Sequence, residues 1–396
     1  MSVILHPAQK KALFLLLFLI PFLMGLGVDS YVPSMPAIQT YFHASSHATQ
    51  LTIGFYMLGY ALGQLLLGIL SDSLGRRKII LFWGAVYVVA NIAAAFSPSV
   101  AWVMFYRFLQ GFAIAGPAVA VRAIPADCFS GLELTKAMGF LATSWALGPI
   151  LGPFIGSYIE FYFHWQANFY FLAGYAVLTF IYAAIVLKET HLDRSPLHFP
   201  KILGALKEAL THPVFLIYAT IASLIYSILV IFNVVAPFLI QVDLGYSAVV
   251  YGRVALVLGL SYFLGNFSMR TFVGRVGSPR LILIGVVGSF VLALILLGVS
   301  MLFPMSLWSI MVPTLVMFYL CGVAFPNLIG TLAGLFPKTA GTSSAIYGSF
   351  VCAGVFLLSS LSALLPSHSQ VPLAVVYLVL VSICMCLLVL KRIKLR

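Results

Sequence analysis

The chain has 396 residues, of which 62% are hydrophobic and only 8% are charged, whereas soluble domains carry about a quarter charged residues. So few charged side chains cannot cover soluble domains of this total length, and that class is excluded. The net charge of +12 is explained by basic residues in the predicted cytoplasmic loops (below), so it does not indicate a nucleic-acid partner. The five cysteines lack the C-x-x-C spacing of a zinc site.

A membrane-spanning helix needs about 20 mostly apolar residues. The apolar runs predict twelve such helices, so the expected fold class is an all-α membrane protein. The first run follows Lys10 and Lys11, exceeds a signal-peptide core in length and lacks a small-residue cleavage site, so we expect it to be a span. In chain order the spans are expected at Lys11–Tyr31, Ala48–Leu70, Ile79–Phe96, Val100–Ile124, Lys136–Ile159, Asn168–Leu187, Val214–Leu239, Val249–Met269, Leu281–Leu302, Ser306–Leu335, Thr342–Leu365 and Val371–Leu390.

One long polar connector divides these spans into six and six. The expected domains are an N-terminal six-helix bundle (1–190), a cytoplasmic connector (191–213) and a C-terminal six-helix bundle (214–396), and similar segments after spans 2 and 8 favour pseudo-symmetry between the bundles. With both termini cytoplasmic, every Lys and Arg outside the spans falls on the cytoplasmic side, as the positive-inside rule requires.

Few charged residues fall inside the predicted spans. Asp29 is the one acid in apolar sequence, and Arg107 lies at a similar depth in span 4. Ionisable groups at membrane depth are usually functional, so we expect Asp29 to exchange a proton and Arg107 to be its partner. A static ion pair, or an Asp29 exposed at the outer boundary of the membrane, is the alternative. Arg122 either reaches the interface or pairs with Asp127, and Arg253 is expected to reach the outer interface.

Polar and aromatic residues at helical spacing predict a substrate cavity between the spans, although packing between helices would give the same pattern. With one acid, such a cavity suits lipophilic neutral or cationic small molecules. The predicted cavity residues are Tyr56, Tyr60, Gln64, Gln110, Tyr226 and Asn233.

The loop after span 2 carries a specific pattern. Its residues Gly68, Asp72, Gly75, Arg76 and Arg77 resemble the signature G-x-x-x-D-R-x-G-R-R of the major facilitator superfamily, with Ser73 in place of the first arginine. The resemblance implies the fold of that family and a charge latch that stabilises one conformation.

Two further patterns resemble motifs of the same family. Arg107-Phe-Leu-Gln110-Gly111 is similar to the span-4 motif R-x-x-Q-G, whose arginine is linked to proton coupling. In span 5, Gly148, Pro149 and Gly152 resemble the antiporter motif G-P-x-x-G-G, with Pro153 replacing the last glycine. The glycines of such a motif allow close helix approach.

The segment from Asp29 to Pro36 is similar to span 1 of the Bcr/CflA-type drug:proton antiporters. This resemblance implies a monomeric exporter of drugs or small metabolites in a bacterial inner membrane, with protons, substrate and lipid as its partners. A dedicated transporter of one metabolite such as a siderophore, possibly an importer, and a non-transporting scaffold are the alternatives. No phosphate-binding G-x-x-x-x-G-K-[ST] sequence occurs, so an ion gradient is the expected energy source, and no enzyme activity, cofactor or metal is expected.

Overall fold

The structure is a computed structural model that describes residues 7–191, 199–335, 340–365 and 369–394. Its described residues form helices joined by short turns, without a strand. In chain order the elements are α1 (Pro7–Asp29), η1 (Val32–Ser34), α2 (Met35–Tyr41), α3 (Ser46–Leu74), α4 (Arg76–Ala95), α5 (Val100–Cys128), α6 (Gly131–Tyr162), α7 (Trp165–Val186), α8 (Phe199–Thr211), α9 (Pro213–Pro237), η2 (Phe238–Asp243), α10 (Ala248–Val276), α11 (Ser278–Leu302), α12 (Leu307–Leu335), α13 (Ala340–Ser362) and α14 (Gln370–Lys394).

Twelve helices among the described residues are long and apolar enough to cross a membrane, counting α1, η1 and α2 as one. The predicted number of spans is therefore confirmed. Several helices extend beyond the apolar runs: α6 begins at Gly131, whereas the apolar run begins at Lys136. Hydropathy identifies only the part of a helix that lies in hydrocarbon, and these helices continue past it.

Two features of the chain differ from the sequence-based expectation. The first span does not end at Tyr31, because α1 stops at Asp29 and the chain continues through η1 into α2. Pro33 causes this break, since it has no N–H to donate to the carbonyl of Asp29. The predicted connector 191–213 contains the helix α8, whose apolar residues recur at helical spacing. Residues 192–198 of this connector lie outside the described residues.

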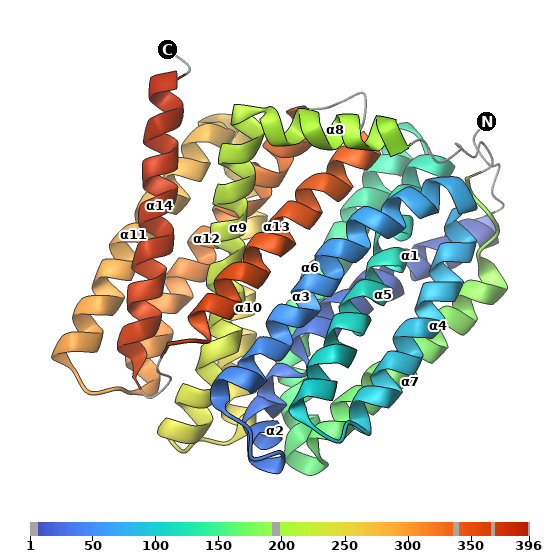
Figure 1. The fold of residues 1–396 in the computed structure, drawn as a ribbon. Coiled ribbons are helices and arrows are strands. Elements are labelled where there is room, and N and C mark those ends of the chain that lie inside the picture. Colours follow the sequence, from blue (N-terminus) through green and yellow to red (C-terminus); the bar gives the residue numbers. More distant parts are fainter. Residues whose placement is uncertain (1–6, 192–198, 336–339, 366–368, 395–396) are drawn as a thin grey trace.

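The helices form two groups (Figure 1). The first group consists of α1 to α7, in which α1 contacts α6 and α3 contacts α5. The second group consists of α9 to α14, in which α12 contacts both α10 and α11. The groups meet where α3 packs against α13 and α6 packs against α10. Both described chain ends and α8 lie at one end of the bundle, which we call the terminal face.

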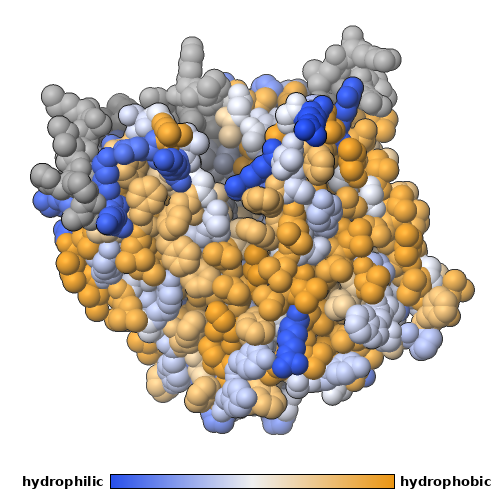
Figure 2. Space-filling view, turned by 180° about the vertical axis from the view of Figure 1, so that it is seen from behind, coloured by the Kyte–Doolittle hydropathy of each residue, from blue (hydrophilic) through white to orange (hydrophobic). Residues whose placement is uncertain are grey.

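The outer surface of the bundle is apolar over most of its length. Figure 2 shows an orange belt over the flanks, with the strongly hydrophilic side chains gathered mainly towards the terminal face. Large apolar side chains on outward helix faces are exposed, such as Val89 on α4 and Leu178 and Ile185 on α7. Exposed apolar surface on this scale is what a lipid-facing surface requires.

The helices α1 and α6 approach each other closely at the predicted span-5 motif. A Cβ added to Gly148 would collide with the backbone of Gly25, and one added to Gly25 would lie 2.7 Å from the Cδ atom of Pro149. One turn on, a Cβ at Gly152 would lie 3.1 Å from the Cβ atom of Asp29. The glycines of this motif therefore fix the position of the end of α1, which carries Asp29.

Replacing Gly148 with alanine is expected to destabilise the protein by about 1–3 kcal/mol, because the new methyl group must push two backbones apart. Gly139 is a matched control, because it lies in the same helix and an added Cβ there would meet nothing within 4 Å. We expect Gly139→Ala to be neutral or stabilising, since alanine is the better helix former. Thermal unfolding of the detergent-purified variants, followed by tryptophan fluorescence, checks this, and equal shifts for the two variants would contradict it.

Candidate functional site

Asp29 lies at the junction of the two helix groups, at the last residue of α1. The residue is 5% exposed, and its Oδ1 atom accepts a hydrogen bond of 2.7 Å from Nδ2 of Asn233 on α9. The Oδ1 atom of Asn233 in turn accepts a bond of 3.1 Å from the hydroxyl of Tyr251 on α10. The structure thus brings together two of the predicted site residues, Asp29 and Asn233, and adds Tyr251, which the sequence analysis did not find.

Arg107 on α5 is fully buried next to the end of α1. Its Nη1 atom donates to the backbone oxygen of Gly27 at 2.8 Å, and Nη2 donates to that of Val28 at 3.4 Å. The guanidinium also lies 4.2 Å from the ring centroid of Tyr56 and 4.7 Å from that of Tyr31, within range of cation–π attraction.

The predicted ion pair between Asp29 and Arg107 is not among the ion pairs of the described residues, and this expectation is wrong. The reason is that α1 ends at Asp29, so the carbonyls of Gly27 and Val28 belong to its last turn and have no partner within the helix. The C-terminal end of a helix attracts cations. Arg107 therefore binds the helix end instead of the carboxylate, and it fixes the backbone just before Asp29.

The predicted cavity residues separate into different environments. Gln110 is buried between α5 and α4, where its Oε1 accepts from Arg107 and its Nε2 donates to the backbone oxygen of Ala90. Tyr56 is buried beneath the guanidinium of Arg107. Tyr226 on α9 is half-buried and stacks on Phe325, with ring centroids 5.4 Å apart. These three side chains therefore contact neighbouring helices of their own group.

Tyr60 and Gln64, the other two cavity residues on α3, contact Arg122 of α5. Nη2 of Arg122 donates to Oε1 of Gln64 at 2.8 Å and to the hydroxyl of Tyr60 at 3.4 Å. The predicted pairing of Arg122 with Asp127 is not found among the described residues, because Asp127 binds Arg76 instead. Arg253 donates to the hydroxyl of Tyr158 at 3.2 Å in an exposed position, as expected for a residue at the bundle surface.

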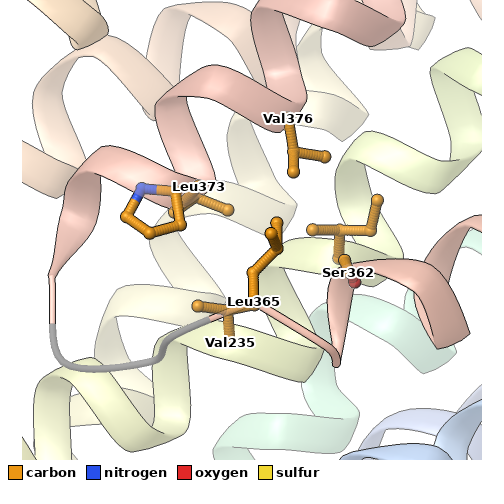
Figure 3. Close-up of a pocket in the computed structure, with 7 residues that line it drawn as sticks. Val235, Ser362, Leu365, Leu373 and Val376 are labelled. Carbon is orange, nitrogen blue, oxygen red and sulfur yellow. The ribbon is translucent and has the colours of Figure 1, made fainter.

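A small pocket lies between α9, α14 and the end of α13 (Figure 3). Its lining is apolar apart from one serine hydroxyl, and it includes none of the predicted cavity residues. We therefore do not assign it to the substrate. The lining residues are Ile231, Val235, Ser362, Leu365, Pro372, Leu373 and Val376.

The predicted latch residues meet where α3 turns into α4. Gly75 forms the turn with φ of +99°, a conformation that favours glycine, and α4 begins at Arg76. The guanidinium of Arg76 binds the carboxylates of Asp72 and Asp127. Arg77 donates to the backbone oxygen of Ala184 on α7.

Two further residues belong to the latch, and the sequence did not predict that role for either of them. Asp127, at the end of α5, accepts from Nε of Arg76 at 3.4 Å and from the hydroxyl of Thr190 at 3.1 Å. Glu189, just after α7, accepts the backbone N–H groups of Arg76 and Arg77 at 2.9 and 3.3 Å, and so caps the start of α4. The positive-inside rule places the segments of both acids on the cytoplasmic side, where it also places the loop after span 2. This shared side is the feature of the sequence from which their role in the latch could have been predicted.

Comparison with known proteins gives the family. Residues 17–359 match the Major Facilitator Superfamily, and the chain belongs to this family. It is similar to a chloramphenicol resistance protein of Pseudomonas aeruginosa (28% identity, covering 96% of this chain and 90% of that protein). It is also similar to multidrug resistance protein D of Escherichia coli (25%, covering 90% of each chain) and to a bicyclomycin resistance protein homolog of Haemophilus influenzae (27%, covering 92% and 93%).

Solved structures agree on the fold. A D-xylose–proton symporter superposes with a TM-score of 0.75 at 15% identity, covering 95% of this chain and 97% of that chain. The predicted resemblance to the major facilitator fold and to drug-resistance relatives of Bcr/CflA type is confirmed. The protein is thus a multi-pass membrane transporter with twelve spans.

Proposed function

We propose that this protein exports lipophilic drugs or small metabolites across a bacterial inner membrane in exchange for protons. The named activities of its relatives, resistance to chloramphenicol, bicyclomycin and multiple drugs, support export of such compounds. The protein would work as a monomer without enzymatic activity, and the two halves 1–190 and 214–396 would move against each other around the connector 191–213.

The observation that carries this proposal is the position of Asp29. It is a buried acid on the first helix group whose carboxylate is hydrogen bonded to Asn233 of the second group. A hydrogen bond to a charged carboxylate is about twice as strong as one between neutral groups. Uptake of a proton by Asp29 would therefore weaken the link between α1 and α9 and favour separation of the groups at this point.

Arg107 would act on Asp29 through the backbone. By binding the carbonyls of Gly27 and Val28, its guanidinium holds the end of α1 and brings a positive charge close to the carboxylate without neutralising it by direct contact. Such an arrangement leaves Asp29 free to exchange its proton while its position stays fixed.

The terminal face would be cytoplasmic. Arg76, Arg77 and Lys10 lie on the segments that reach this face, where Lys10 pairs with Glu133 at 2.8 Å. A cytoplasmic location agrees with the excess of Lys and Arg that the positive-inside rule requires. Substrate would then enter from the terminal face and protons from the opposite one.

The test is coupled flux in proteoliposomes that contain the purified full-length protein. Radiolabelled chloramphenicol is the first probe, and an imposed pH gradient is expected to drive its accumulation while a pH dye reports counter-movement of protons. Collapse of the gradient with a protonophore should abolish accumulation.

The same vesicles separate the alternatives. Competition by several unrelated lipophilic compounds supports a multidrug exporter, whereas competition by a single metabolite supports a dedicated transporter. Proton movement in the same direction as the substrate would indicate import. If none of the tested solutes is transported and their addition causes no proton flux, the proposal of a transporter is wrong, and the alternative of a non-transporting scaffold is supported.

A further inference from the structure

Arg122 carries a positive charge inside the bundle without an acidic partner among the described residues. Its Nε atom donates to the backbone oxygen of Ala118 in its own helix, at 3.1 Å, and Nη2 donates to the neutral groups of Gln64 and Tyr60. The nearest acid along the chain, Asp127, is already bound to Arg76. Within the described part of the chain, Nη1 makes no hydrogen bond. The guanidinium therefore retains donors and an uncompensated charge.

The surroundings of Arg122 have the character of a binding site. Its guanidinium lies over the ring of Trp145 on α6, 5.4 Å from the ring centroid, and that tryptophan is 39% exposed. Tyr60 and Gln64, which accept hydrogen bonds from the same guanidinium, are buried. Arg122 is half-buried, six residues before the end of α5, or about 9 Å of helix from it.

The second helix group also reaches this point. Nε2 of Gln64 donates to Sγ of Cys352 on α13 at 3.6 Å, which orients the oxygen of the same amide towards Arg122. A Cβ added to Gly348 of α13 would lie 2.6 Å from that oxygen, so the two helices are in close contact here. The arginine is thus positioned by a chain of contacts that crosses between the two groups, as alternating access requires of a substrate site.

We infer that Arg122, Tyr60, Gln64 and Trp145 form a subsite for a lipophilic carboxylate, which gives the substrate class of the proposed exporter. The inference rests on the proposed function. The planar guanidinium fork matches a carboxylate, with Nη1 as a free donor. The aromatic faces of Trp145 and Tyr60 suit the apolar body of such a molecule. An unpaired charge at membrane depth is costly, and a ligand of opposite charge removes that cost.

This subsite changes the expectation drawn from the sequence. A single buried acid predicts neutral or cationic substrates, whereas the structure adds a cationic group at a separate place in the bundle. Asp29 binds Asn233 and is assigned to the proton, and Arg122 is assigned to the substrate anion. Acidic lipophilic compounds are therefore included among the substrates.

The test uses three probes that share a naphthalene ring and differ in charge: 2-naphthoate, 2-naphthamide and 2-naphthylmethylammonium. Binding to the full-length protein in nanodiscs is measured by isothermal titration calorimetry. We expect naphthoate to bind at least about tenfold more tightly than naphthamide, and the ammonium compound to bind most weakly. Arg122→Gln should remove the preference for naphthoate, and Arg122→Lys should retain only part of it because the fork is lost.

Arg253→Gln is the matched control, because Arg253 also lies in a span and binds a neutral tyrosine hydroxyl. It should leave the naphthoate preference unchanged. Trp145→Leu should weaken naphthoate and naphthamide alike, which distinguishes the aromatic wall from the charge even if Arg122→Gln fails to fold. Equal binding of naphthoate and naphthamide to the wild type, or a preference that survives in Arg122→Gln, would overturn the subsite.

Failure of this inference is distinguishable from failure of the proposed function. Equilibrium binding does not require proton coupling, so Asp29→Asn should keep the naphthoate preference. If chloramphenicol is still exchanged for protons while naphthoate shows no preference, only the subsite is wrong. If naphthoate binds through Arg122 and no substrate-dependent proton flux occurs, only the coupling is wrong.

Discussion

Replacing Asp29 with asparagine is expected to abolish accumulation of substrate against its gradient while the protein stays folded. The amide oxygen can still accept the hydrogen bond from Asn233, so the contact between α1 and α9 is retained. The amide cannot exchange a proton at neutral pH, so the imposed pH gradient can no longer drive the cycle. The loss should be complete for uphill transport, whereas substrate counterflow, which needs no proton, should persist.

The measurement is chloramphenicol accumulation and counterflow in the same proteoliposomes, with thermal unfolding as a check on the fold. Glu133→Gln is the control, because it removes a carboxylate that is 57% exposed and pairs with Lys10 at the terminal face. An exposed pair of this kind contributes little, about 0–1 kcal/mol, so this variant should transport normally. Full uphill accumulation by Asp29→Asn would refute the assignment of the proton to Asp29.

The membrane fold could be predicted from the sequence because the lipid imposes a simple rule on each segment. Apolar length alone located α3, α9 and α11, and the alternation of basic loops supported their number. Apolar length does not identify helices that do not span the hydrocarbon. It therefore missed α8, and it missed the continuation of the first span through η1 and α2.

The candidate site was predictable only in part. Asp29 could be found because a lone acid in apolar sequence is conspicuous, but its partner could not, since Asn233 lies 204 residues away and approaches through the packing of α9 on the end of α1. Arg107 was predicted as the partner of Asp29 because the two residues lie at a similar depth in the membrane. That prediction did not take into account that α1 ends before Pro33. The free carbonyls at this helix end bind the guanidinium of Arg107 instead.

Replacing Arg76 with alanine is expected to slow transport strongly, because this side chain joins three helices at the terminal face. The side chain of Arg76 is 7% exposed and its guanidinium binds Asp72 of α3 and Asp127 of α5, while the backbone of Arg76 begins α4. Its loss leaves the half-buried Asp127, among the described residues, with the hydroxyl of Thr190 as its hydrogen-bond donor. Loss of such a partner costs about 1–3 kcal/mol.

The loss of this contact affects α3, the helix of the first group that packs against α13 of the second group. α3 packs against α13 along the junction, with a Cβ at Gly68 reaching 3.5 Å from the Cβ atom of Ala345. If the end of α3 is no longer held to α5, it can move without carrying the rest of the first group with it. Closure of the terminal face then becomes less cooperative, and we expect the initial rate of proton-driven chloramphenicol uptake to fall by about tenfold.

The neighbouring arginine is the matched control for this prediction. Arg77 is exposed, and the hydrogen bond of its side chain goes to the backbone oxygen of Ala184 at 3.0 Å, so among the described residues its guanidinium pairs with neither Asp72 nor Asp127. Arg77→Ala should therefore change the transport rate and the unfolding temperature much less than Arg76→Ala, although both remove one positive charge from the same face. Equal losses in the two variants would mean that the face needs only positive charge and that the contacts of Arg76 with Asp72 and Asp127 do not stabilise a conformation of the transporter.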